Sequence, residues 1–330
     1  MASTSSGQDT YVDPWQEYRT ISAKLKRRFL RRPNVSEATR EFAQLANRLK
    51  EDDCVHYAGL CHLAIARCEH QSANPSGETS ALKNAARFFL EAEKDRNHMG
   101  LPGYHQNLTT AIHCYGHAIK THVEQKQVLL AASLSLELGR HLQRLEQNHE
   151  AMEHLQRAVR YFEIEPLNKM AAMYWLAVCQ ADVGKYAESL RTVDDLWTVA
   201  LKRPSYGAAS FPAQPDATSD TLRTCEVATV LLILLLRAQE RHLNERQKGV
   251  LQMYTTVNDP SEVLPPENSH LSSEEEFLLT QSLAMSVQWN EATSADKNLT
   301  ELVRHHWKNV FLVGLGLDLV QKLYDGSFDV

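Results

Sequence analysis

Glycine and proline are scarce in this chain of 330 residues, which has 13 and 11 of them. Both residues interrupt helices, so their scarcity leaves long stretches that can be helical. Long apolar runs are lacking as well. The longest, Val227–Leu236, is about half of the roughly 20 residues that a membrane span needs. We therefore expect no membrane span, and residues 1–13 are too polar to form a signal peptide.

Motifs for nucleotide binding and catalysis are also missing. The chain has no GxxxxGK[ST] loop, no GxGxxG, no GxSxG and no paired metal motif. Its acidic, histidine and cysteine residues form no spacing typical of catalysis. We therefore expect no enzymatic activity, no catalytic residue, no cofactor and no metal, and we look for the function on the surface.

Charge and cysteine usage narrow the class further. A net charge of −6 does not favour nucleic-acid binding. Six cysteines without a signal peptide indicate reduced thiols in the cytosol or nucleus. Cys54, Cys61 and Cys68 are spaced by seven, which is typical of a buried helical seam rather than of zinc ligands. His113 and His117 lie one turn apart without the Glu of HExxH, so a structural role is favoured there too.

An internal repeat is the strongest positive signal. Between Leu130 and Pro204 the same unit occurs twice, with corresponding positions 38 apart. The recurring set is Leu138-Gly139, Leu142, Ala151, Leu155, Ala158 and Pro166, followed by Leu176-Ala177, Gln180, Ser189, Val193, Leu196 and Pro204. Each copy is expected to be a helix, a short turn and a second helix, which is the tetratricopeptide pattern. Apolar residues also return every three or four positions along the chain. The predicted fold class is therefore all-α, a tetratricopeptide-like helical-hairpin solenoid.

Composition changes divide the chain into four predicted segments. Residues 1–12 are a polar, Ser-rich tail, residues 13–202 an N-terminal helical block, residues 203–219 a flexible linker and residues 220–330 a C-terminal helical block. Between two helices of the first block, Gln71–Thr79 is expected to form a loop. In the second block, Cys225–Leu236 is apolar on all sides, so we expect other helices or a partner to enclose it.

A basic cluster is the first candidate binding site. It comprises Lys24, Lys26, Arg27, Arg28, Arg31 and Arg32. Like charges at helical spacing repel one another, so a plain solvated helix face explains them poorly. A nuclear-localisation or nucleic-acid patch, an anionic membrane and an acidic protein all fit, with an acidic protein as the leading target.

Two further candidate sites are predicted. Arg140 and Arg144 would lie on the inner face of the first repeat, where solenoids of this kind hold peptides, and could receive a carboxylate. In the second repeat that face would show Tyr174, Val178, Ala181 and Asp182. Near the C-terminus, Val310–Leu323 has more apolar residues than one core stripe needs, Phe311 and Leu315 among them. It forms either a binding surface or a helix packed on residues 225–236.

Three stretches resemble one known family. Tyr18–Glu37 (YRTISAKLKRRFLRRPNVSE), Arg223–Leu236 (RTCEVATVLLILLL) and Glu275–Met285 (EEFLLTQSLAM) are similar, in order and spacing, to the family of the forty-kilodalton huntingtin-associated protein, also called the factor VIII intron 22 protein. The resemblance spans roughly Tyr18 to Met285.

The resemblance implies a helical solenoid that binds and stabilises huntingtin, itself a HEAT-repeat protein. It also implies a cytoplasmic protein that an early-endosomal Rab GTPase recruits and that affects endosome motility, with the nucleus as a second location. The alternative from the residues themselves is an adaptor that captures a peptide in its concave groove.

Overall fold

The structure is a computed structural model that describes residues 13–26, 34–202, 217–237, 242–256, 265–271, 273–289 and 315–324. Within these ranges it contains thirteen α-helices and no strand, which confirms the all-α prediction. The predicted tail 1–12 lies outside the described residues. So does the predicted linker, apart from residues 217–219, which are helical. The helices are α1 Pro14–Lys24, α2 Val35–Glu51, α3 Val55–Gln71, α4 Pro75–His98, α5 Gln106–Glu124, α6 Val128–Arg144, α7 Asn148–Tyr161, α8 Pro166–Asp182, α9 Tyr186–Leu201, α10 Ala217–Leu236, α11 Glu245–Thr255, α12 Glu274–Trp289 and α14 Leu315–Tyr324.

The repeat is present with the predicted register. Helices α6 and α7 begin at Val128 and Asn148, and α8 and α9 begin 38 residues later in each case, at Pro166 and Tyr186. The corresponding core positions are buried in both copies, from Leu138 and Leu142 to Val193 and Leu196. The second copy has a polar residue at two of these positions, Gln180 and Ser189, and both side chains are hydrogen-bonded. Thr192 Oγ1 donates to Gln180 Oε1 at 2.8 Å, and Ser189 Oγ donates to the Ala177 carbonyl at 2.9 Å.

The turn inside each of the two repeats contains a left-handed residue. In the two repeats it is Glu146, with φ 61°, and Gly184, with φ 84°, again 38 positions apart. The amide that follows each of them bonds back to the preceding helix, Gln147 N to Leu142 O and Lys185 N to Gln180 O. This geometry satisfies carbonyls that the end of a helix would otherwise leave unpaired. The turn between α6 and α7 and the turn between α8 and α9 therefore take only three residues each.

One predicted loop is much shorter than expected. Helix α3 extends to Gln71 and α4 begins at Pro75, so the predicted loop 71–79 is reduced to residues 72–74. Asn74 caps α4 through its side-chain oxygen, which accepts from Gly77 N at 3.2 Å. Proline at the first helical position needs no hydrogen-bond partner for its nitrogen. The polar composition of this stretch therefore marks a helix start rather than a loop.

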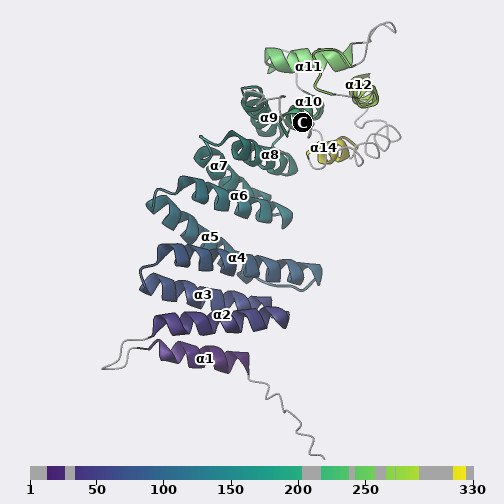
Figure 1. Ribbon diagram of the computed structural model, residues 1–330. Coiled ribbons are helices and arrows are strands. Elements are labelled where there is room, and N and C mark those ends of the chain that lie inside the picture. The colour runs from purple at the N-terminus through teal and green to yellow at the C-terminus, as the bar shows by residue number, and fades with distance from the viewer. Residues whose placement is uncertain are drawn as a thin grey trace, which may run out of the picture. The chain divides into compact units, whose positions relative to one another are not determined.

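Contacts divide the chain into two compact units, Met1–His141 and Leu142–Val330. In the first unit, helices α2 to α5 pack in chain order, each on the next, and α1 packs on α2 (Figure 1). Alanines such as Ala58, Ala85 and Ala111 are fully buried where the helices meet, which permits close approach. Tyr115 and Arg87 both donate to Glu137 Oε1, at 2.8 and 2.6 Å, and so join three helices.

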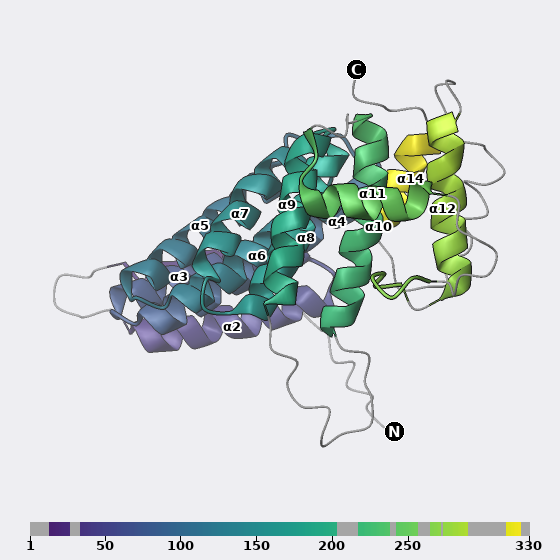
Figure 2. The same ribbon diagram turned by 90° about the horizontal axis from the view of Figure 1, so that it is seen from above.

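In the second unit, α10 is the central helix. It packs against α9, α11, α12 and α14, with α9 on one side and α12 and α14 on the other (Figure 2). Residues such as Val230, Leu231 and Leu235 are fully buried, which confirms that the apolar stretch is enclosed by helices. The predicted apolar segment at the C-terminus is partly described: Leu319, Val320 and Leu323 of α14 are completely buried in this core. For these three residues the structure supports packing on residues 225–236 rather than an open surface.

The core of the second unit also holds one buried carboxylate. Glu226 on α10 is 1% exposed and accepts three hydrogen bonds, from Tyr254 Oη at 2.6 Å, Ser269 Oγ at 2.7 Å and His270 N at 2.6 Å. A buried carboxylate is tolerated when hydrogen bonds replace its hydration. Glu226 thereby attaches α11 and residues 265–271 to the central helix.

Candidate partner-binding surface

An aromatic cluster forms at helix α1 in the first unit. Asp13 caps the helix by accepting from Trp15 N at 3.0 Å, and Pro14 occupies the first helical position. Trp15 and Tyr18, three positions apart, therefore lie on one face of the helix. Their rings stack with centroids 5.3 Å apart, and the Trp15 ring lies 6.5 Å from that of Tyr57 on α3. The Arg19 guanidinium lies 5.5 Å from the centroid of the Trp15 ring. The indole therefore has a cation as well as two aromatic rings as its neighbours.

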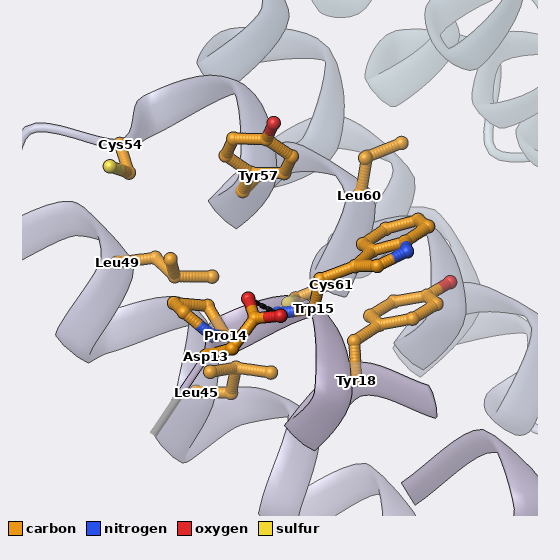
Figure 3. Close-up of a pocket in the computed structure, with 10 residues that line it drawn as sticks. All are labelled: Asp13, Pro14, Trp15, Tyr18, Leu45, Leu49, Cys54, Tyr57, Leu60 and Cys61. Carbon is orange, nitrogen blue, oxygen red and sulfur yellow. Dashed lines mark hydrogen bonds between the residues drawn. The ribbon is translucent and has the colours of Figure 1, made fainter. Parts of the chain in front are cut away.

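These aromatic rings surround a pocket of about 210 Å³ (Figure 3). It is lined by residues from α1, α2 and α3 together with their caps: Asp13, Pro14, Trp15, Tyr18, Leu45, Leu49, Cys54, Tyr57, Leu60 and Cys61. We call it the α1 pocket. A cavity of about 150 Å³ can hold a benzene ring, so the α1 pocket has room for one large apolar side chain. Trp15 is 42% and Tyr57 is 49% exposed, so both rings can be reached from outside.

Burial controls the protonation of two side chains that line the α1 pocket, Cys61 and Tyr18. Burial raises the pKa of the Cys61 thiol to about 12, and the carboxylate of Glu17 adds to this, so the thiol stays protonated and unreactive. Burial also raises the pKa of Tyr18. Exposed Trp and Tyr beside a desolvated apolar pocket are typical of the few residues that supply most of the energy of a protein–protein contact.

The basic cluster is described only at its start. Lys24 donates to Glu41 Oε1 of α2 at 2.5 Å, and this hydrogen bond raises the pKa of the lysine. Lys26 is exposed just beyond the end of α1. Arg27, Arg28, Arg31 and Arg32 lie outside the described residues, so the binding role of the cluster stays a prediction. The aromatic cluster beside it was not predicted as a site, although a Trp and a Tyr three positions apart after Asp-Pro indicate such a face.

The two arginines proposed for a peptide groove lie one turn apart on α6. Arg144 is exposed and Arg140 is half-buried. In the second repeat the predicted open face is largely covered: Val178 and Ala181 are buried, and α14 packs against α8. Lys322 of α14 donates to the Ala181 carbonyl, lies 3.7 Å from Asp182 Oδ1 and lies 5.5 Å from the ring centroid of Tyr186. The prediction of an open face was wrong for Val178 and Ala181, because a helix distant in sequence occupies it.

The structure describes only some of the other residues singled out in the sequence. Leu315 is the first residue of α14, and Phe311 lies outside the described residues. Cys61 and Cys68 are buried as predicted, whereas Cys54 is exposed because α3 begins one residue after it. In the described residues no group of three or more His, Cys, Asp or Glu side chains could hold a metal ion. None of the described helices is both long enough and apolar enough to cross a membrane.

Stacked helical hairpins with a repeated register define a helical-repeat protein. The family model of the soluble NSF attachment protein, SNAP, matches residues 30–197 and agrees with this class, which confirms the tetratricopeptide-like fold. Two curated relatives extend the comparison to most of the chain. The 40-kDa huntingtin-associated proteins of Mus musculus and Rattus norvegicus are each 33% identical to it over 86% of both chains. The chain belongs to the family of the 40-kDa huntingtin-associated protein.

Proposed function

We propose that this chain is a non-enzymatic scaffold subunit that forms a stabilising complex with huntingtin. The observation that carries the proposal is the 33% identity, over 86% of both chains, to two proteins named for their association with huntingtin. At that identity and coverage the helical framework is shared, so its binding faces are candidates for the same type of partner.

The surface of the first unit supports a role in protein binding. Besides Trp15 and Tyr57, it exposes large apolar residues at two turns: Met99, Leu101 and Tyr104 after α4, and Val123 and Val128–Leu130 around the α5–α6 turn. Covering such residues with a partner removes apolar area from water, which is the main source of affinity in large interfaces. We place the centre of the contact at the α1 pocket, where the exposed rings adjoin a cavity.

Size-exclusion chromatography with light scattering tests this proposal. The chain is expressed alone and together with huntingtin from the same source. A single co-eluting species with the summed mass, together with aggregation of the lone chain, is the expected result. A well-folded monomer that does not associate with huntingtin would contradict it. The double variant Trp15→Ala/Tyr57→Ala should weaken the complex at least tenfold, since a truncated hot-spot residue costs about 2 kcal/mol or more.

A finer function rests on the family resemblance. We propose that the huntingtin complex is recruited to early endosomes through a Rab GTPase and affects endosome motility, which makes the chain cytoplasmic, with a further nuclear pool. The test is capture of the complex by an endosomal Rab GTPase in its GTP-loaded and GDP-loaded forms. Retention by the GTP form alone is expected, and equal or absent retention by both forms would contradict recruitment.

The alternative is a peptide-binding adaptor that uses Arg140 and Arg144. The coverage of α8 by α14 leaves it only the first repeat. This alternative requires that Arg140→Glu/Arg144→Glu abolishes binding while charge reversal at 24–32 does not. The scaffold proposal requires the huntingtin complex to survive reversal of the two arginines.

A further inference from the structure

A cation beside the α1 pocket has no carboxylate partner among the residues that the structure describes. The Arg19 guanidinium lies over the Trp15 ring, 5.5 Å from its centroid, and Arg19 is exposed. By contrast, Lys24 of α1 and Arg48 of α2 are each paired with a carboxylate of the neighbouring helix. Arg19 is therefore available for a carboxylate from another molecule.

The contact with Trp15 leaves the N–H groups of Arg19 available. An arginine binds a carboxylate through two parallel N–H groups, whereas its attraction to an aromatic ring involves its charge and the face of the ring. The planar guanidinium loses little conformational freedom for each hydrogen bond that it forms. Arg19 is thus suited to bind an anion next to the apolar pocket.

The end of the α1 pocket away from Trp15 is acidic. Figure 3 shows Cys54 at that end, and residues 50–53, Lys-Glu-Asp-Asp, directly precede it and are all exposed. Asp13, which also lines the pocket, accepts a hydrogen bond from Trp15 N. A carboxylate of a partner is repelled by this end and attracted by Arg19, so the charges allow one orientation only.

We propose that the α1 pocket binds a segment of the partner that combines a large apolar side chain with a neighbouring acidic residue. The inference rests on the proposed function, in which the partner is huntingtin. The apolar side chain fills the cavity beside Leu49 and Tyr57, and the carboxylate pairs with Arg19. Burial of the apolar side chain supplies the affinity, and the ion pair fixes the direction of the segment.

The first test changes the charge at Arg19. Variants are co-expressed with huntingtin, and the dissociation of each purified complex is followed after dilution. Arg19→Glu should dissociate about tenfold faster or more, because two carboxylates then face each other. Arg19→Lys keeps the charge and should dissociate at a rate between wild type and Arg19→Glu. Arg40→Glu, the same change at an exposed position of α2, should leave the rate unchanged.

The second test fills the cavity. Cys54 is exposed, lines the pocket and makes no side-chain capping hydrogen bond, so a larger side chain there removes no contact of the fold. Cys54→Trp should accelerate dissociation about tenfold or more by displacing the apolar side chain of the partner. Cys54→Ser should not. The combined effect of Arg19→Glu and Cys54→Trp should be smaller than the product of the two, since both act on one segment.

The possible outcomes separate this inference from the proposed function. Wild-type dissociation in Arg19→Glu or Cys54→Trp, or equal acceleration by Arg19→Glu and Arg40→Glu, overturns the inference alone. A complex that holds two copies of the chain by light scattering, and one copy after Cys54→Trp, would assign the pocket to a second copy and also overturn it. Failure of the wild-type chain to bind huntingtin overturns the proposed function, and this inference with it.

Discussion

A half-buried histidine is one residue through which pH acts on this fold. Burial lowers the pKa of His154 on α7 to about 4, and the positive charge of Arg157 adds to this. Its Nδ1 is buried without a hydrogen-bond partner among the described residues. The folded chain therefore holds this imidazole neutral, whereas the unfolded chain takes up a proton near pH 6.5.

The resulting prediction concerns stability between pH 6.5 and pH 4. Because the folded-state pKa lies below the unfolded one, the stabilisation is fully present above pH 6.5. It is lost as the pH falls towards 4, by at most about 3 kcal/mol. In His154→Gln this loss should disappear from the unfolding free energy measured in urea. His149→Gln, an exposed residue of the same helix, should keep it. Parallel pH curves for wild type and His154→Gln would contradict the assignment.

At the scale of elements, the turns of the two repeats offer a matched pair. Gly184 and Glu146 occupy corresponding left-handed positions, with φ 84° and 61°. A side chain at positive φ costs roughly 1 kcal/mol or more, which glycine avoids.

The substitutions Gly184→Ala and Glu146→Gly are therefore expected to change the unfolding free energy in opposite directions. Gly184→Ala should lower the unfolding free energy by about 1 kcal/mol, and Glu146→Gly should raise it by up to about 0.5 kcal/mol, less because glycine also loosens the unfolded chain. Thermal melts with calorimetry measure both. Destabilisation by both changes would mean that the two turns are not equivalent.

For helix α14 the sequence left two roles open, a binding surface or packing in the core, and the buried residues support packing. Leu319 and Leu323 are 0% exposed in the core around α10. Leu319→Ala and Leu323→Ala should each lower stability by about 2–5 kcal/mol, the usual cost of a buried Leu→Ala change. Leu278→Ala on α12, where the side chain is 40% exposed, should cost much less. Small effects at all three positions would show that α14 is a removable appendage.

At the scale of the whole molecule, charge is expected to control how fast the partner arrives. Lys24, Lys26, Arg27, Arg28, Arg31 and Arg32 concentrate positive charge in a chain whose net charge is −6. Such clusters steer association, and salt screens them.

Reversing Lys26, Arg27 and Arg28 to Glu should slow association with huntingtin at low salt about tenfold or more and change dissociation little. The difference should vanish at high salt in surface-based kinetic measurements. Lys50→Glu, an exposed position on α2, is the single-site control. A change confined to the dissociation rate would place these residues inside the contact instead.

The sequence by itself determined the fold class, the register of the repeat and the burial of the α10 stretch. These features follow from local periodicity and from residue size, which a single chain records directly. The 38-residue spacing was sufficient to locate both helical hairpins. The sequence also predicted that Cys61 and Cys68 are buried, since a seven-residue spacing keeps them on one helix face.

Only the tertiary structure decided which surfaces remain open. The α1 pocket needs Trp15, Leu49 and Tyr57 from three helices. The hydrogen bond from Lys322 to the Ala181 carbonyl joins residues 141 positions apart. A local sequence pattern cannot predict such a contact. Which helices pack together depends on whether the shape and charge of their whole faces match.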